Sequence, residues 1–387
     1  METTYIVSAR RTPVGGFMGK LADFTAVQLG TLAAKAAIDQ SGIGAHEIDA
    51  VYLGHVLTAG LGQNTARQAG LQAGLRPEAD STTINKVCAS GMKAVMLAAQ
   101  QIELGREHVL LAGGMESMSN APHILPMRRS HKFGDAVLTD TVKHDGLTDA
   151  YSALHMGAIA ENCVKKYGLS REQQDAYALE SYRRAAAATA AGKFYGELVP
   201  VTLKQGTVSA DEDIDKVIHA KVPQLKPAFL HDGTITAANS SNLNDGAAML
   251  VLASAQAVHT HTLQPLARIV ASADAALAPE WFTMAPAAAM QKALQCAGLT
   301  VNDIDLFEIN EAYAAVALAN ALELNIPHEK LNIYGGAVAI GHPIGASGAR
   351  IICTLLSALR QEKKRYGMAA ICNGGGGASA IIIENLF

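Results

Sequence analysis

The sequence has no uninterrupted run of about 18 apolar residues, the length that a membrane-spanning helix needs, although 49% of its 387 residues are apolar. Charged residues make up only 17% of the chain, and the net charge is −4. Lysines and arginines are interspersed among acidic residues, so no strongly basic face is available for a nucleic acid. We therefore expect a globular chain that acts on a small molecule, with neither a membrane nor a nucleic acid as its partner.

Cysteine is scarce, and its few copies form no recognisable framework. The five cysteines are Cys88, Cys163, Cys296, Cys353 and Cys372, an odd number without CxxC spacing. This pattern argues against a disulfide framework and against a zinc site, and it indicates reduced thiols, of which one or two are reactive. The N-terminal stretch METTYIVSARRTPVGG also lacks the regions of a signal peptide and the Arg-rich, Ser-rich pattern of a transit peptide. We therefore expect a cytoplasmic location.

The chain does contain an internal repeat. Residues 37–53, AIDQSGIGAHEIDAVYL, match residues 293–309, ALQCAGLTVNDIDLFEI, 256 positions later (37 to 293). The segment CASGMKAVM, which begins at Cys88, matches GASGARIIC, which begins at Gly345, 257 positions later (88 to 345). A looser third match pairs LLAGGMES from Leu110 with AICNGGGGAS from Ala370. A nearly constant separation indicates a duplication, and both copies have the pattern of alternating strands and helices.

The duplication sets the expected domain organisation. The second copy begins near Leu266, and residues 118–243 have no counterpart after it. We therefore predict an N-terminal half (1–117), an inserted loop domain (118–243), a return segment that completes the N-terminal half (244–265) and a C-terminal half (266–387). Duplicated α/β units commonly pack face to face around a pseudo-two-fold axis, so we expect a functional site between the halves.

Cys88 is the first candidate for chemistry. It lies directly before a predicted helix whose apolar residues Met92, Val95, Met96 and Ala99 recur at helical spacing. The unpaired N–H groups and the dipole of a helix N-terminus favour a thiolate, and the small residues after Cys88 leave room for a substrate. A nucleophile is one interpretation. A buried cysteine that packs as a small hydrophobic residue is the alternative.

Three further polar residues occupy glycine-rich or strand-ending positions. His342 lies in YGGAVAIGHPIGASGAR, where the backbone can approach a ligand closely, and Cys372 ends a short apolar strand before four glycines. Two cysteines, one histidine and a glycine-lined turn suggest acyl transfer. Asn310, beside Glu311 in LFEINEAYAAV, is placed to orient a water or to hydrogen-bond a carbonyl. As alternatives, His342 caps the helix that follows it and Asn310 is the N-cap of its own helix.

Seven segments in order resemble the signature sequences of thiolases, enzymes that condense or cleave acyl-CoA thioesters by a Claisen reaction. They are NKVCASGMKA, AGGMESMS, HMGAIAENC, ITAANSSNLNDGAA, NEAYA, GGAVAIGHPIGASGAR and CNGGGGASA. The resemblance covers essentially the whole chain and is strongest to the acetyl-CoA acetyltransferase branch. It implies a duplicated five-layered α/β/α/β/α fold whose inserted loop domain helps to bind coenzyme A (CoA).

The resemblance also implies a role for each candidate residue. Cys88 would accept the acetyl group, His342 would activate Cys88, and Cys372 would take the α-proton of a second acetyl-CoA. His342 and a water held by Asn310 would stabilise the enolate, while the backbone N–H groups of Cys88 and Gly374 would stabilise the tetrahedral intermediate. The implied reaction is a reversible, ping-pong condensation of two acetyl-CoA to acetoacetyl-CoA and CoA, in which CoA is a substrate or product and no cofactor is required.

Further residues are implied to contact the substrate, an ion or other subunits. The CoA and acyl contacts would be Leu147, His155, Met156, Phe229, Ala237, Ser241, Phe282 and Tyr313. A potassium ion would be held by Tyr182 and by carbonyls of Ala237, Ala238, Ser240 and Val338. The basic stretch MRRSHK (127–132) matches a region of oligomer contacts, which implies a homotetramer built as a dimer of dimers. Two departures stand out: Tyr313 replaces a phenylalanine common in the family, and Thr283 follows Phe282 where potassium-activated members have proline.

Other functions stay open at this point. Within the family, a broader 3-ketoacyl-CoA thiolase of fatty-acid β-oxidation is the main alternative. A non-catalytic CoA or lipid carrier on the same fold is an alternative of another class, since a fold does not fix its chemistry. A carrier would need neither thiol, and a decarboxylating ketoacyl synthase would carry a second histidine in place of Cys372.

Overall fold

The computed structural model describes residues 2–128 and 133–386. The N-terminal half is built from five main strands and three helices: β1 (Thr4–Arg11), α1 (Ala26–Ser41), β3 (Ala50–Gly54), α2 (Thr65–Gln72), β4 (Asp80–Ile84), α3 (Ser90–Glu103), β5 (Val109–Ser117) and β10 (Asn244–Ser254). The short strand β2 (Gly15–Gly16) pairs with the start of β10. The helix α6 (Ala255–Thr260) then leads to the second half.

The C-terminal half repeats this order. Its elements are β11 (Ala267–Ala276), α7 (Ala285–Ala297), β12 (Leu306–Ile309), α8 (Ala314–Leu324), α9 (Ala337–Ile340), α10 (Ile344–Gln361), β13 (Tyr366–Asn373) and β14 (Gly377–Asn385). The strand order is β4-β3-β5-β10-β1 followed by β11-β14-β13-β12, so the two halves mirror each other about the β1–β11 pair. This symmetry confirms the duplication that the sequence predicts.

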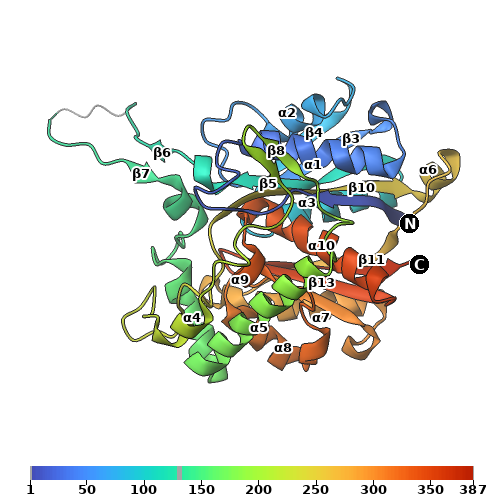
Figure 1. The fold of residues 1–387 in the computed structure, drawn as a ribbon. Helices are drawn as coiled ribbons and strands as arrows, with labels where there is room; N and C mark the ends of the chain where they lie inside the picture. The colour runs from blue at the N-terminus through green and yellow to red at the C-terminus, as the bar shows by residue number, and fades with distance from the viewer. Residues whose placement is uncertain (1, 129–132, 387) are drawn as a thin grey trace.

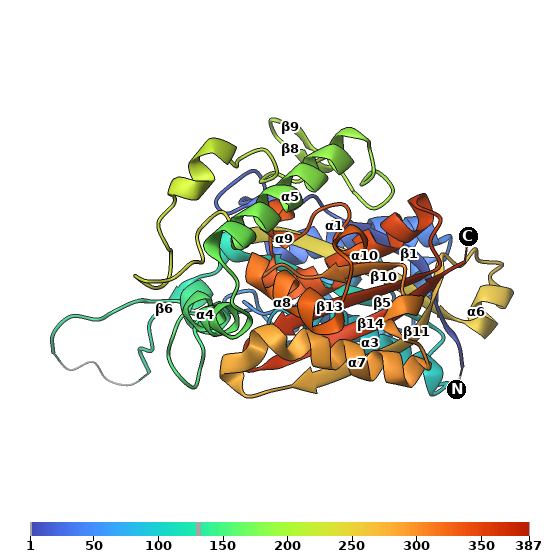
Figure 2. The ribbon, with the colours of Figure 1, turned by 90° about the horizontal axis from the view of Figure 1, so that it is seen from below.

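The layers explain why most strands are apolar along their whole length. Helices α3 and α10 lie between the two halves of the sheet, α1 covers the outer face of the first half, and α7 covers the outer face of the second (Figures 1 and 2). In β5, Leu110 faces the central core while Leu111 faces the core under α1. Because both faces are covered, a strand has no solvent side to keep polar. The five-layered arrangement is therefore confirmed.

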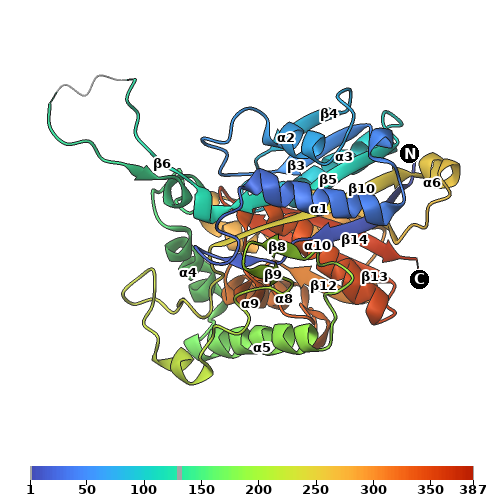
Figure 3. The same ribbon diagram turned by 45° about the horizontal axis from the view of Figure 1, so that its top comes forward.

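The inserted segment lies against both halves. It contains β6 (His123–Ile124), β7 (Thr139–Asp140), α4 (Met156–Tyr167), α5 (Arg171–Ala190), β8 (Val201–Leu203) and β9 (Gly206–Val208). The excursion that carries β6 and β7 extends away from the body of the molecule (Figures 1 and 3). Residues 129–132 of the predicted oligomer-contact stretch lie outside the described residues. No helix in the described part of the chain is long and apolar enough to cross a membrane.

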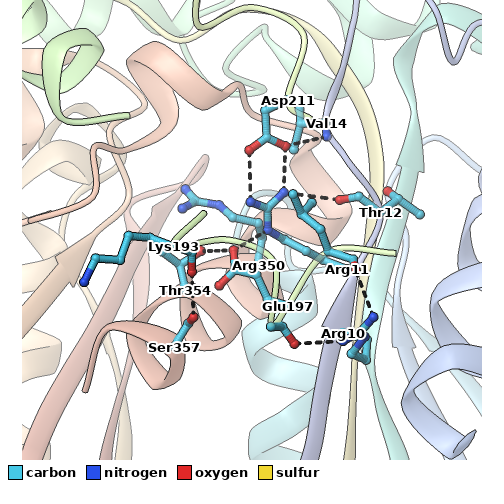
Figure 4. Close-up of polar contacts among 12 residues, drawn as sticks. Arg10, Arg11, Thr12, Val14, Lys193, Glu197, Asp211, Arg350, Thr354 and Ser357 are labelled. Atoms are coloured by element: carbon cyan, nitrogen blue, oxygen red, sulfur yellow. Dashed lines mark hydrogen bonds and ion pairs between the residues drawn. The ribbon is translucent and has the colours of Figure 1, made fainter. Parts of the chain in front are cut away.

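A buried ion cluster joins the insert to both halves (Figure 4). Arg11 of β1 donates from Nε to Glu197 (2.6 Å) and from Nη1 and Nη2 to Asp211 (2.7 and 2.9 Å). Thr354 of α10 donates to the same Glu197 oxygen (3.1 Å). Burial alone would lower the pKa of Arg11, but the two carboxylates outweigh it and raise that pKa. The guanidinium therefore stays charged and holds three parts of the chain together.

Candidate active site

The two copies of the repeated Ala-Ser-Gly motif meet at the centre of the molecule. Helices α3 and α10 approach so closely that a Cβ on Gly91 would lie 2.9 Å from the carbonyl oxygen of Gly345. A Cβ on Gly348 would lie 2.4 Å from the backbone nitrogen of Met92. Only glycine permits this approach. The close crossing brings the N-terminal ends of both helices, and the loops that precede them, to one place.

Cys88 lies in a tight, strained turn just before α3. Val87 has a φ of +48°, a left-handed conformation that is a genuine outlier for a β-branched residue. The turn is fixed by Ser90, whose backbone N–H and hydroxyl both donate to the Val87 carbonyl (3.0 and 2.6 Å). The Ser90 hydroxyl also accepts from the N–H of Lys86 (2.8 Å). These contacts present Cys88 as a half-buried side chain at the end of the turn.

The helix terminus favours a thiolate at Cys88, as expected, but it is not the dominant influence. Burial raises the pKa of Cys88 to about 12. The backbone N–H groups of Cys88 and Gly374 act on the sulfur in the opposite direction, but they do not outweigh desolvation, and the buried Glu116 charge raises the pKa further. Cys88 is therefore a thiol that must lose its proton as it attacks. The same two N–H groups are the ones predicted to form the oxyanion hole.

His342 is held in one tautomer. The Ser347 hydroxyl donates to the carbonyl of Pro343 (2.9 Å), so it accepts the hydrogen bond that joins it to His342 Nδ1 (2.5 Å). This assignment places the proton on Nδ1 and leaves Nε2 as an acceptor. Burial, aided by the charge of Arg350, lowers the pKa of His342 to about 3. The ring is therefore neutral at physiological pH.

His342 does not cap the helix that follows it. The N-cap of α10 is Pro343, and no side chain caps it. The backbone N–H of His342 donates to Asn244 (2.9 Å), and its Nε2 is buried without a partner in the described part of the chain. The ring thus has one fixed nitrogen and one nitrogen free to exchange a proton.

The predicted catalytic thiols and His342 share one cavity. Cys372, near the end of β13, is 1% exposed, and burial followed by the charge of Cys88 raises its pKa. A cavity of about 300 Å³ is lined by Cys88, His342, Cys372 and Gly374. The structure therefore brings together four of the five residues predicted for catalysis.

The fifth residue, Asn310, is buried and is not among the residues that line this cavity. The expectation that Asn310 is the N-cap of its helix is wrong, because α8 begins after Tyr313. Both polar atoms of the Asn310 amide are buried and have no hydrogen-bond partner among the described residues. An amide that neither caps a helix nor bonds to protein is available for a small polar ligand.

All eight residues predicted to contact CoA or the acyl group line the same cavity; they are Leu147, His155, Met156, Phe229, Ala237, Ser241, Phe282 and Tyr313. The Phe229 ring stacks on His155 (4.7 Å between centroids) and meets Tyr313 edge-on (5.9 Å). Phe282, on the 3-10 turn Pro279–Met284, and Met156, at the start of α4, are both nearly buried. These bulky side chains bound a mostly apolar space, as a thin pantetheine arm and a short acyl group require.

Two buried carboxylates that sequence reasoning did not use hold the catalytic loops. Glu116 accepts from the backbone N–H groups of Val56, Leu57 and Gly345 (3.1, 3.2 and 2.9 Å) and so joins the first turn of α10, just after His342, to the N-terminal half. Its sequence signal is an isolated charge in the apolar stretch VLLAGGMES.

Glu311 has the same role on the other side. It accepts from Tyr177 and Ser181 of α5 (2.8 Å each), from Asn332 (2.8 Å) and from the N–H of Val338 (3.0 Å). It therefore ties the inserted segment to the loop that leads to His342.

The residues predicted to hold a potassium ion are partly assembled. Tyr182 of α5 lines a hollow with Ala237 and Ala238. Its hydroxyl has no hydrogen-bond partner in the described ranges, and burial followed by the charges of Asp213 and Glu311 raises its pKa to about 12. The hollow is also lined by Lys216, which pairs with Asp213 (2.7 Å). Within the residues described, no group of three or more His, Cys, Asp or Glu side chains is arranged to bind a metal ion.

Comparison with known proteins identifies the family of the chain. The family model "Thiolase, N-terminal domain" matches residues 4–256, and "Thiolase, C-terminal domain" matches residues 263–385. The cytosolic acetyl-CoA acetyltransferase of Gibberella zeae is 50% identical over 393 residues, which cover 100% of this chain and 99% of that protein. The mitochondrial acetyl-CoA acetyltransferase of Rattus norvegicus is 50% identical over 392 residues, which cover 100% of this chain and 92% of that protein.

Two solved structures are similar over the whole chain. A thiolase from Ascaris suum, crystallised in complex with coenzyme A, superposes with a TM-score of 0.96 at 46% identity and covers 100% of both chains. The acetyl-CoA acetyltransferase of Bacillus anthracis gives a TM-score of 0.97 at 40% identity, covering 100% of this chain and 99% of that one. The family resemblance seen in the sequence is confirmed, and the chain belongs to the thiolase family.

Proposed function

We propose that this thiolase is an acetyl-CoA C-acetyltransferase, which joins two acetyl-CoA molecules into acetoacetyl-CoA and CoA and also catalyses the reverse reaction. The observation that carries the proposal is that Cys88, His342 and Cys372 line one apolar cavity. A carrier would need neither thiol. The names of the relatives at about 50% identity support the choice of substrate.

In the first half-reaction, the proton of the Cys88 thiol moves to Nε2 of His342 as the sulfur attacks the thioester carbonyl of acetyl-CoA. The backbone N–H groups of Cys88 and Gly374 stabilise the oxyanion that forms on the attacked carbonyl. Both groups act on the Cys88 sulfur, to which that carbonyl carbon becomes bonded. The carbon–sulfur bond to CoA then breaks, and the departing CoA takes the proton from His342. The products are S-acetyl-Cys88, neutral His342 and CoA.

In the second half-reaction, the thiol of Cys372 gives its proton to His342 and then removes the α-proton of a second acetyl-CoA. A thiolate with a raised pKa is a stronger base, which this weakly acidic carbon needs. Protonated His342 and the Asn310 amide, through a water, stabilise the enolate oxygen. The enolate carbon attacks the acetyl carbonyl, the bond to Cys88 breaks, and the proton on His342 returns to the Cys88 sulfur.

Substrate choice follows from the size of the acyl end of the cavity. Phe282 and Met156 are 3% and 7% exposed and pack against neighbouring side chains, so a long acyl chain would have to displace them. We therefore favour acetoacetyl-CoA over the longer 3-ketoacyl-CoAs of β-oxidation. The test is thiolysis of acetoacetyl-CoA and of 3-ketooctanoyl-CoA by the purified full chain. Higher kcat/KM for acetoacetyl-CoA is expected, and a preference for the C8 substrate would contradict the proposal.

Finer features are part of the same proposal. We propose a cytoplasmic homotetramer, a dimer of dimers, that serves fatty-acid and acetyl-CoA metabolism. Potassium would be held by the Tyr182 hydroxyl and the carbonyls of Ala237, Ala238, Ser240 and Val338, and would tie the CoA-binding loop to the loop before His342. Light scattering tests the tetramer. Thiolysis rates in potassium and in sodium buffers test the ion, and identical kinetics in both would contradict it.

A further inference from the structure

The wall of the catalytic cavity carries a phenol that is not used by the protein. The serine and asparagine side chains of the wall donate to protein acceptors: Ser240 to Thr236, Ser241 to Ala312, and Asn242 to Asp213 (2.7, 3.0 and 3.2 Å). The Tyr313 hydroxyl, by contrast, has no hydrogen bond to any described residue, although Tyr313 is only 6% exposed and lines the cavity. A hydroxyl that lines a cavity and has no protein partner takes its hydrogen bond from water or from the ligand.

The Tyr313 ring lines the cavity that holds the predicted catalytic thiols. It packs edge-on against Phe229, 5.9 Å between centroids. Tyr313 lines the same cavity as the Cys88 and Cys372 thiols, and burial raises the pKa of its hydroxyl. The backbone around it is fixed, because Tyr313 pairs with Ser240 and the N–H of Ala314 donates to Asn239 (2.8 Å). The hydroxyl is therefore a neutral donor in a defined place.

We propose that Tyr313 is a specificity-determining residue that selects acyl groups carrying an oxygen atom beyond the 3-keto group over plain alkyl chains. The proposal rests on the thiolase activity proposed above. An alkyl chain that covers the hydroxyl leaves a buried donor unpaired, whereas a hydroxyl or carbonyl oxygen on the chain accepts its hydrogen bond. A site that hydrogen-bonds a polar substrate group rejects the analogue without that group far more strongly than an apolar pocket rejects a substrate of the wrong size.

The test compares two substrates of nearly equal size, 3-ketohexanoyl-CoA and 5-hydroxy-3-ketohexanoyl-CoA, with acetoacetyl-CoA as the reference. In the wild-type protein we expect kcat/KM for the hydroxylated substrate to exceed that for the alkyl substrate by about tenfold. In Tyr313→Phe this ratio should fall to one or below, mainly because the alkyl substrate is cleaved faster. Tyr195→Phe, at a residue that is 76% exposed, is the matched control and should keep the wild-type ratio.

The ratio of the two kcat/KM values, hydroxylated over alkyl, decides whether the proposal holds. A wild-type ratio of one or below overturns the proposal without any variant, so it stays testable even if Tyr313→Phe folds poorly. A Tyr313→Phe ratio equal to that of the wild type also overturns it. If the wild-type protein does not cleave acetoacetyl-CoA at all, the proposed function fails and this inference fails with it. Cleavage of acetoacetyl-CoA with an unaltered ratio defeats only the inference.

Discussion

Replacing Ser347 by alanine tests whether one hydrogen bond sets the reactive nitrogen of His342. The Ser347 hydroxyl accepts a hydrogen bond from the Nδ1–H group of His342 and donates its own to the carbonyl of Pro343, so the tautomer depends on this single side chain. Ser347 and His342 are both buried, and water does not readily replace the lost acceptor. In Ser347→Ala the Nδ1–H group is left unpaired, which costs about 1–3 kcal/mol. The tautomer with the proton on Nε2, which cannot accept a proton from Cys88, then competes.

This free-energy cost corresponds to a kcat/KM that is about 5- to 160-fold lower for acetoacetyl-CoA thiolysis. The rate of acetylation by acetyl-CoA alone should fall by a similar factor, because it depends on proton transfer from Cys88 to His342. Rapid quenching followed by mass spectrometry of the intact protein measures that rate. Urea denaturation separates the effect from a loss of stability.

Ser357→Ala is the matched control for this experiment. Ser357 lies on the same helix α10 and also donates to a backbone carbonyl, that of Lys193 (3.2 Å), but it has no contact with His342. We expect it to keep the wild-type acetylation rate. If Ser347→Ala retains acetylation within about threefold of the wild type, or if both variants lose it equally, the tautomer argument is refuted.

The remaining predictions concern the thiols, pH and the ion cluster. Cys88→Ala should show no acetyl-enzyme by mass spectrometry, and near-normal turnover would contradict its role as nucleophile. Cys372→Ala should still acetylate Cys88 but lose carbon–carbon bond formation and cleavage, so equal loss of acetylation in the folded variant would refute the division of labour. The pKa of His342 is lowered to about 3 and that of Cys88 is raised to about 12, so both groups are neutral between these two pH values. The rate of single-turnover acetylation should therefore not change from about pH 5.5 to 9. A fall in this rate on the acid side, near the ordinary histidine pKa, would contradict the prediction. Arg11→Ala leaves two buried carboxylates unpaired and should lower the free energy of unfolding by about 3–5 kcal/mol, as measured in urea.

The sequence predicts the duplication well because repeated segments report on repeated structure. The match between CASGM at Cys88 and GASGA at Gly345 identifies two helix N-termini, and the structure shows that these helices cross at their small residues. A repeat has a physical consequence here: the equivalent glycines Gly91 and Gly348 each lie against the backbone of the opposite helix. That is why one pair of short motifs is enough to place the site between the halves.

The supporting residues are harder to predict because their role exists only in three dimensions. Glu116 holds Gly345, 229 positions away in the chain, and Glu311 joins α5 to Val338. Their sequence context shows only an isolated carboxylate next to apolar residues. A sequence alone does not say which distant N–H groups will need an acceptor once the loops have packed.

The ionisation of Cys88 shows how local and global effects compete. Its position before α3 and the nearby N–H groups favour a thiolate, which is all that local sequence can indicate. The cavity that forms when the halves close removes water from the same sulfur, and this desolvation dominates, raising the pKa of Cys88 to about 12. A nucleophile that rests as a thiol depends on a neighbouring base at the moment of attack. The free Nε2 of His342 provides that base. The raised pKa of Cys88 makes a base necessary, and the fixed tautomer of His342 makes Nε2 able to accept the proton.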